Sequence, residues 1–158
     1  MKKVLVAMAL LGSVAFAASL GVPWFLDTND TDSYPPPAQD MFNGSNTYIT
    51  LKNTTGSPIT LTISYWRANG TSVTPAANTF VLPANTAISF TPASNLTQSE
   101  GVGAAVPNAD ESGGKVYGGS ATISWSGSAG DIIGRVYQID NLTGSGLLSA
   151  AYTLPEGQ

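Results

Sequence analysis

The feature that most constrains this chain is a set of short segments in which apolar and hydroxyl residues alternate. The longest is "NTYITLKNTTGSPITLTISYW", residues 46–66. Successive side chains of a β-strand point to opposite faces, so a period of two predicts strands with one buried face. The residues expected in the core from this stretch are Ile49, Leu51, Ile59, Leu61, Ile63 and Tyr65. Thr50, Thr60, Thr62 and Ser64 are expected on the other face.

Turn signals divide the rest of the chain into further strands. The break "NTTGSP" predicts that residues 46–66 form a β-hairpin, and Asn69-Gly70 predicts a second turn. Two short strands are expected around Pro83-Ala84-Asn85, and three more in "GSATISW", "DIIGRVYQID" and "GLLSAAYTLP". Residues 94–119 are rich in glycine and polar residues and are expected to be an irregular loop. The fold class predicted is all-β, a single antiparallel β-sandwich of about seven or eight strands over residues 46–158.

The first residues have the layout of a secretory signal peptide. "MKKVLVAMALLGSVAFA" has two lysines, an apolar run and the small–x–small triplet that ends at Ala17, so residues 1–17 are expected to be removed on export. The alternative is a retained N-terminal anchor, because residues 4–26 carry no charge. With cleavage, no membrane span is expected in the mature chain, which would be periplasmic or extracellular.

An acidic, proline-rich leader is expected between the signal peptide and the sandwich, at residues 18–45. Its start, "GVPWFLD", is compatible with a short strand, and Pro35 to Pro37 favour an extended polyproline spacer. "DTNDTD" within it resembles the start of a calcium loop. Its hard oxygens make Asp27, Asn29, Asp30 and Asp32 the candidate Ca²⁺ ligands. The EF-hand pattern fails further along, where Asp32 and Ala38 replace the required Gly and Glu, so a solvated acidic spacer is the other interpretation.

Composition excludes several functions. The 158 residues contain no cysteine and no histidine, which removes Ser-His-Asp and Cys-His nucleophiles and nearly all zinc, copper and haem ligation. We therefore expect no catalytic residues, no other cofactor and no enzyme activity. The formal net charge of −4 argues against nucleic acid as a partner. Only 10% of the residues are charged, which leaves little repulsion between copies and favours a homo-oligomer.

The order of the β segments resembles that of the sensory rhodopsin transducer family. The resemblance rests on "TYITLKNTTGSPITLTISYWRANGT", "FVLPANTAISF", "SATISW", "GRVYQI" and "LSAAYTLP", within residues 46–155. It implies a compact β-sandwich that tends to form homo-oligomers. The same order of segments is also similar to that of secreted bacterial β-proteins with an "LKN…GTP…LPA" pattern. The family's signalling role concerns a cytoplasmic partner and does not fit an exported chain.

Outward aromatic residues are the remaining candidates for a ligand or partner surface. Adjacent Tyr65 and Trp66 must point to opposite faces, so Trp66 is expected to leave the core. We predict that Trp66, Trp24 and Tyr48 form the ligand or partner surface. The function expected is a non-catalytic structural or interaction protein of the bacterial envelope or extracellular space that associates with itself. The alternative is a carbohydrate-binding module, so the expected partners are a second copy, a glycan or an envelope protein.

Overall fold

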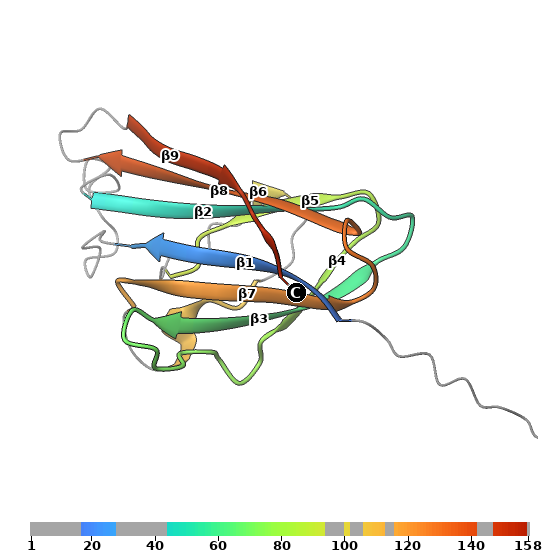
Figure 1. The fold of residues 1–158 in the computed structure, drawn as a ribbon, viewed down its shortest axis with the longest axis horizontal. Coiled ribbons are helices and arrows are strands. Elements are labelled where there is room, and N and C mark those ends of the chain that lie inside the picture. The colour runs from blue at the N-terminus through green and yellow to red at the C-terminus, as the bar shows by residue number, and fades with distance from the viewer. Residues whose placement is uncertain are drawn as a thin grey trace, which may run out of the picture.

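Two antiparallel sheets pack face to face in this protein (Figure 1). The computed structural model describes residues 17–27, 44–93, 100–101, 106–112, 116–141 and 147–157. Each sheet has four strands of at least four residues and one two-residue strand at an edge. The predicted all-β sandwich of seven or eight strands is therefore confirmed. Within the described ranges, the structure has no helix with the length and hydropathy needed to cross a membrane.

The first sheet, called sheet A, has the strand order β10-β1-β7-β3-β4. Its strands are β1 (Ala17–Leu26), β3 (Ile59–Arg67), β4 (Thr79–Leu82), β7 (Gly118–Ser126) and β10 (Glu156–Gly157). The second, sheet B, has the order β6-β5-β2-β8-β9. Its strands are β2 (Gly44–Asn53), β5 (Ala87–Phe90), β6 (Glu100–Gly101), β8 (Ile132–Asn141) and β9 (Leu147–Thr153). After β9 the chain crosses from sheet B to the edge of sheet A, where β10 pairs with β1 (Figure 1).

The sandwich starts earlier in the chain than the expected residue 46. Residues 18–26, expected in the leader with at most a short strand, form β1 together with Ala17, the expected last residue of the signal peptide, and pair with β7 along most of their length. The register shifts between Val22 and Phe25, so a bulge holds both residues on the buried side although three positions separate them. This bulge breaks the period of two, which explains why the strand was hard to read. The rest of the expected leader, residues 28–43, lies outside the described residues.

The predicted hairpin at residues 46–66 is wrong. β2 pairs with β5 and β8 in sheet B, whereas β3 pairs with β4 and β7 in sheet A. The connection between them is therefore an arch from one sheet to the other. A hairpin and an arch bury the same alternate residues, so the pattern does not distinguish them. The expected core residues Ile49, Leu51, Leu61, Ile63 and Tyr65 are fully buried, while Ile59 is half-buried.

Asn53 holds the arch in place from inside the protein. Its Nδ2 lies 2.8, 3.0 and 3.2 Å from the carbonyl oxygens of Ser57, Leu82 and Pro83. Its Oδ1 accepts hydrogen bonds from the backbone N–H and the hydroxyl of Thr55 at 2.9 and 2.8 Å. Because Asn53 is completely buried, these partners replace the water that its amide loses on folding.

The loop expected over residues 94–119 contributes to the core where it is described. Ala109 and Val116 are fully buried, and residues 109–112 form a 3₁₀ helix. The Asp110 carboxylate accepts the N–H of Val116 at 2.7 Å. The Tyr65 hydroxyl donates to the carbonyl of Pro107 at 2.9 Å. These contacts fasten the described part of the loop to the sandwich.

Candidate functional site

Trp24 lies at the bulge of β1 and is 45% exposed. A Cβ at Gly118 would come within 3.5 Å of its indole and 3.0 Å of the Phe25 carbonyl. The absence of a side chain at Gly118 therefore allows the close approach of the Phe25 carbonyl and the Leu26 side chain, 3.1 Å from such a Cβ, whereas the indole would be in ordinary contact. The hydroxyl of Tyr152, from β9 in the other sheet, donates to the Trp24 carbonyl at 3.1 Å. Burial raises the pKa of this hydroxyl above its ordinary value of 10.0.

Trp66 lies near the same end of sheet A. Its partner in β7 is Ser120, and the bulge of β1 lies opposite the same stretch of β7. Trp66 is half-buried, and its neighbour Tyr65 is fully buried, so the predicted split between the two aromatic residues is confirmed. Trp125 of β7 is in the core, with 4% of its surface exposed.

Tyr48 lies on the outer face of sheet B, away from Trp24 and Trp66. It stacks on Tyr137 of β8, with ring centroids 4.9 Å apart and ring planes 7° from parallel. The guanidinium carbon of Arg135 is 5.9 Å from the Tyr137 ring centroid. Sheets A and B turn their outer faces in opposite directions, so the three predicted surface residues do not form one site. The hydroxyl residues expected on one face are also divided between the two sheets. Thr50 lies on sheet B, where its hydroxyl donates a hydrogen bond to the Ser89 hydroxyl at 3.2 Å.

The candidate calcium ligands are only partly described. Asp27 is 5% exposed, and its N–H donates to the Tyr117 carbonyl at 2.8 Å. It also forms a β-bridge with Asn46, which joins the end of β1 to β2. Asn29, Asp30 and Asp32 lie outside the described residues. Among the residues that are described, no group of three acidic, histidine or cysteine side chains is placed to hold a metal ion.

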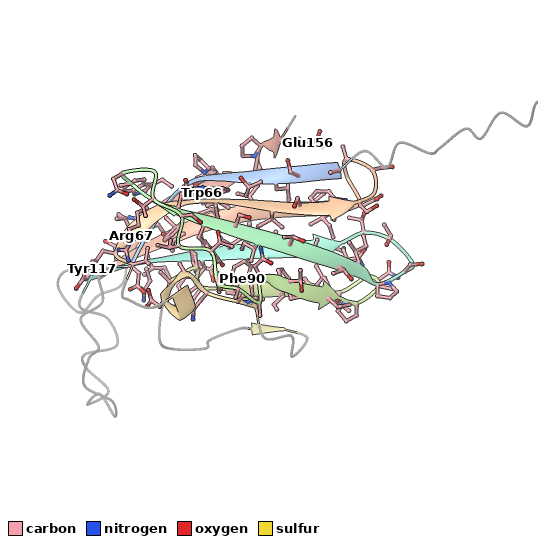
Figure 2. All side chains as sticks on the ribbon, turned by 90° about the horizontal axis from the view of Figure 1, so that it is seen from below. Trp66, Arg67, Phe90, Tyr117 and Glu156 are labelled. Carbon is pink, nitrogen blue, oxygen red and sulfur yellow. The ribbon has the colours of Figure 1, made fainter. Side chains whose placement is uncertain are left out.

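Trp24 lines a surface pocket at this end of sheet A. The pocket has a volume of about 410 Å³ and lies where β1 ends, β3 turns and β7 begins. Arg67 and Tyr117 lie at this end of the molecule in Figure 2. Tyr117 is 59% exposed. The lining residues are Trp24, Leu26, Arg67, Ala68, Asn69, Tyr117 and Gly118.

A tight turn fixes the wall of the pocket that follows β3. The N–H of Gly70 donates to the Arg67 carbonyl, and the N–H of Arg67 donates to the Thr71 carbonyl, each at 2.9 Å. Gly70 has a φ of 83°, which favours glycine. The Asn69 Oδ1 accepts the N–H of Thr71 at 3.0 Å, so the amide NH₂ of Asn69 takes no part in this bond. The turn predicted at Asn69-Gly70 is therefore confirmed, but its role in a pocket was not predicted.

Sequence reasoning missed Arg67, Asn69 and Tyr117 as members of a site. Asn69 was recognised only as a turn residue, and Tyr117 lies in a segment expected to be an irregular loop. Only the pairing of β7 with both β1 and β3 brings these three segments together. An aromatic residue two positions before the alternating run "GSATISW" was the one available signal.

The open edge of sheet B is the second notable surface. β9 is seven residues long, "LLSAAYT", and contains no charge and no proline. Within the described part of the chain it pairs with β8 on one side only (Figure 1). The other three strands at sheet edges have four, two and two residues. Natural sheets usually protect such edges with charges, prolines or bulges, and of these β9 has only a bulge, at residues 148–150, where its register with β8 shifts.

The backbone of β9 directs hydrogen-bonding groups toward this open side. The N–H of Leu154 donates to the Gly134 carbonyl, so the neighbouring pair Arg135 and Thr153 is of the type without mutual hydrogen bonds. Ala151 and Tyr137, two residues along, are the same type of pair. The N–H and C=O groups of Ala151 and Thr153 therefore point away from β8.

No protein-family model, curated protein or solved structure matches this chain. The resemblance to the sensory rhodopsin transducer family stays a prediction.

Proposed function

We propose that this chain is an exported, non-catalytic protein of the bacterial envelope or extracellular space that works by associating with itself. The open edge of β9 is the observation that carries the proposal. The lack of histidine and cysteine supports a non-catalytic role. The layout of residues 1–17 supports export to the periplasm or the extracellular space.

A second copy of β9 is the partner that fits this edge best. Two β9 strands related by a two-fold axis run antiparallel and offer each other the same outward N–H and C=O groups. The strand carries no charge, so such pairing places no like charges opposite each other. The two copies of sheet B would then form one continuous sheet. Self-association by this route also removes the exposed edge.

Sedimentation velocity of the purified protein at micromolar concentration tests the proposal, with Ala151→Pro as the disrupting variant. The Ala151 N–H points away from β8, so proline removes a group that only a partner strand would use. The wild type is expected to sediment as a dimer or larger oligomer and Ala151→Pro as a monomer. A monomeric wild type, or a variant that associates as well as wild type, would overturn the proposal.

Val81→Pro is the matched control on the open edge of sheet A. The N–H of Ile63 donates to the Asn78 carbonyl, so the pairs of β3 and β4 at Thr79 and Val81 are also of the type without mutual hydrogen bonds. The Val81 N–H therefore points away from β3. This strand has four residues, and Val81→Pro is expected to leave the oligomer intact.

A further inference from the structure

Exposed aromatic surface is concentrated at the pocket that ends sheet A. Four large hydrophobic residues of the described chain are exposed, and two of them, Trp24 and Tyr117, line this pocket. Its volume of about 410 Å³ falls within the range of roughly 300 to 1,000 Å³ that is typical of small-molecule sites. Exposed aromatic residues gathered in a hollow mark binding sites more often than isolated ones do.

The backbone of Trp24 is fixed by a contact with the other sheet. The hydroxyl of Tyr152, from the other sheet, donates to its carbonyl at 3.1 Å. A residue whose backbone is already fixed loses less conformational freedom on binding than one in a mobile loop. The face of an aromatic ring is electron-rich, so it attracts the weakly positive C–H groups on one side of a sugar ring. This geometry suits a flat ligand with an apolar face and polar edges.

The polar groups around the pocket are mainly hydrogen-bond donors. Arg67 has five guanidinium N–H donors and carries the only charge among the lining residues. The Asn69 carbonyl oxygen already accepts the Thr71 N–H, so the N–H donors of its amide are the groups left for a ligand. A donor-rich pocket selects a ligand rich in acceptors, and a guanidinium pairs best with a carboxylate through two parallel hydrogen bonds.

We propose that this pocket binds a uronic acid residue of an acidic glycan. The sugar ring stacks on Trp24, and its carboxylate pairs with Arg67. Asn69 donates to a ring hydroxyl. This site lies apart from the open edge of β9, since none of its lining residues comes from that strand, and it holds whether or not the protein associates with itself.

Calorimetric titration with three probes tests the chemical class of the ligand. The probes are a trigalacturonate, the neutral galactose trisaccharide with the same linkage, and sodium acetate as a carboxylate without a ring. The acidic trisaccharide is expected to bind at least about tenfold more tightly than the neutral one, the size of effect expected for a charge-assisted contact. Acetate is expected not to compete. Equal binding of both trisaccharides, binding of neither, or full competition by acetate would overturn the proposal.

Matched variants locate the site. Trp24→Ala and Arg67→Met are each expected to weaken binding of the trigalacturonate about tenfold or more, with circular dichroism to confirm that both fold. Trp66→Ala removes an indole outside the lining, and Arg135→Met removes the same charge on the outer face of sheet B, so both are expected to bind as wild type. Arg67→Lys retains the charge without the planar fork and tests the pairing if Arg67→Met does not fold.

A pocket variant that binds as wild type, or a loss in either control, would contradict this assignment. Ala151→Pro separates the two proposals. It is expected to bind the trigalacturonate normally as a monomer, so failure of the β9 contact leaves the sugar site testable.

Discussion

At the scale of single residues, Asn53 carries more of the fold than its place in a turn-rich break suggests. One buried amide links the end of β2, the arch and the turn after β4. An apolar replacement leaves several buried carbonyl and N–H groups without partners, which costs free energy. This residue determines where the chain leaves sheet B and enters sheet A.

Asn53→Ala is expected to lower the free energy of unfolding by about 2–4 kcal/mol, from lost hydrogen bonds and unsatisfied buried groups. Asn78→Ala is the control, because no hydrogen bond from the Asn78 side chain is found among the described residues, and it should change stability little. Urea denaturation followed by tryptophan fluorescence measures both. An equal loss of unfolding free energy in the two variants would show that the buried Asn53 amide stabilises the protein no more than the Asn78 side chain does.

The raised pKa of Tyr152 predicts that the protein loses stability at alkaline pH. Its pKa in the folded protein is raised above the unfolded value of 10.0, so its stabilising contribution is complete below pH 10. That contribution declines as the pH rises from about 10 through the folded pKa, because burial opposes the phenolate. Chemical denaturation from pH 8 to 11 should show a smaller alkaline decline for Tyr152→Phe than for wild type. Identical pH profiles would contradict this assignment.

At the scale of elements, the close contact of β8 with β2 depends on a missing side chain. A Cβ at Gly134 would lie 2.7 Å from Leu154 Cδ1, 2.9 Å from Leu51 Cδ2 and 3.1 Å from the Thr50 carbonyl. Sheet B and the adjoining Leu154 therefore leave no room here for one more methyl group. Gly134 lies opposite Leu51 in the register of the two strands.

Gly134→Ala is expected to destabilise the protein by about 1–3 kcal/mol through overpacking. Gly56→Ala is the control, since a Cβ at Gly56 meets no atom within 4 Å and its φ is not positive. The control should be neutral or slightly stabilising. Thermal unfolding by circular dichroism compares the two. A Gly134→Ala protein as stable as wild type would mean that the Leu51 and Leu154 side chains move aside easily at this point.

The strands also show what the alternation of apolar and polar residues can and cannot predict. Strand positions and inward faces followed from the period of two, because burial selects apolar side chains in both sheets alike. The pairing of β2 did not follow, since the same pattern fits a hairpin or an arch. β1 was obscured by Pro23 and the bulge, and the pocket residues depend on pairings between distant segments. Trp24 was predicted as a surface residue, but its neighbours were not.

At the scale of the whole molecule, the two sheets differ in outer surface and in edges. The outer face of sheet B carries Lys52, Arg135 and the stacked tyrosines, whereas sheet A turns serine and threonine side chains outward. Sheet A has short strands at both edges, whereas sheet B has one long open edge. Association is therefore expected to be directional and to extend sheet B.

Disulfide cross-linking tests this most directly, because the chain has no cysteine of its own. Single cysteines are placed in turn at residues 149–153, and the protein is oxidised with glutathione disulfide. Residues opposite each other in antiparallel strands have Cα atoms about 4.5–5.5 Å apart, within disulfide range. Covalent dimers are expected to peak at the position nearest the two-fold axis and to be absent for Val81→Cys on β4. Equal cross-linking at all positions, or none along β9, would contradict self-association through this edge.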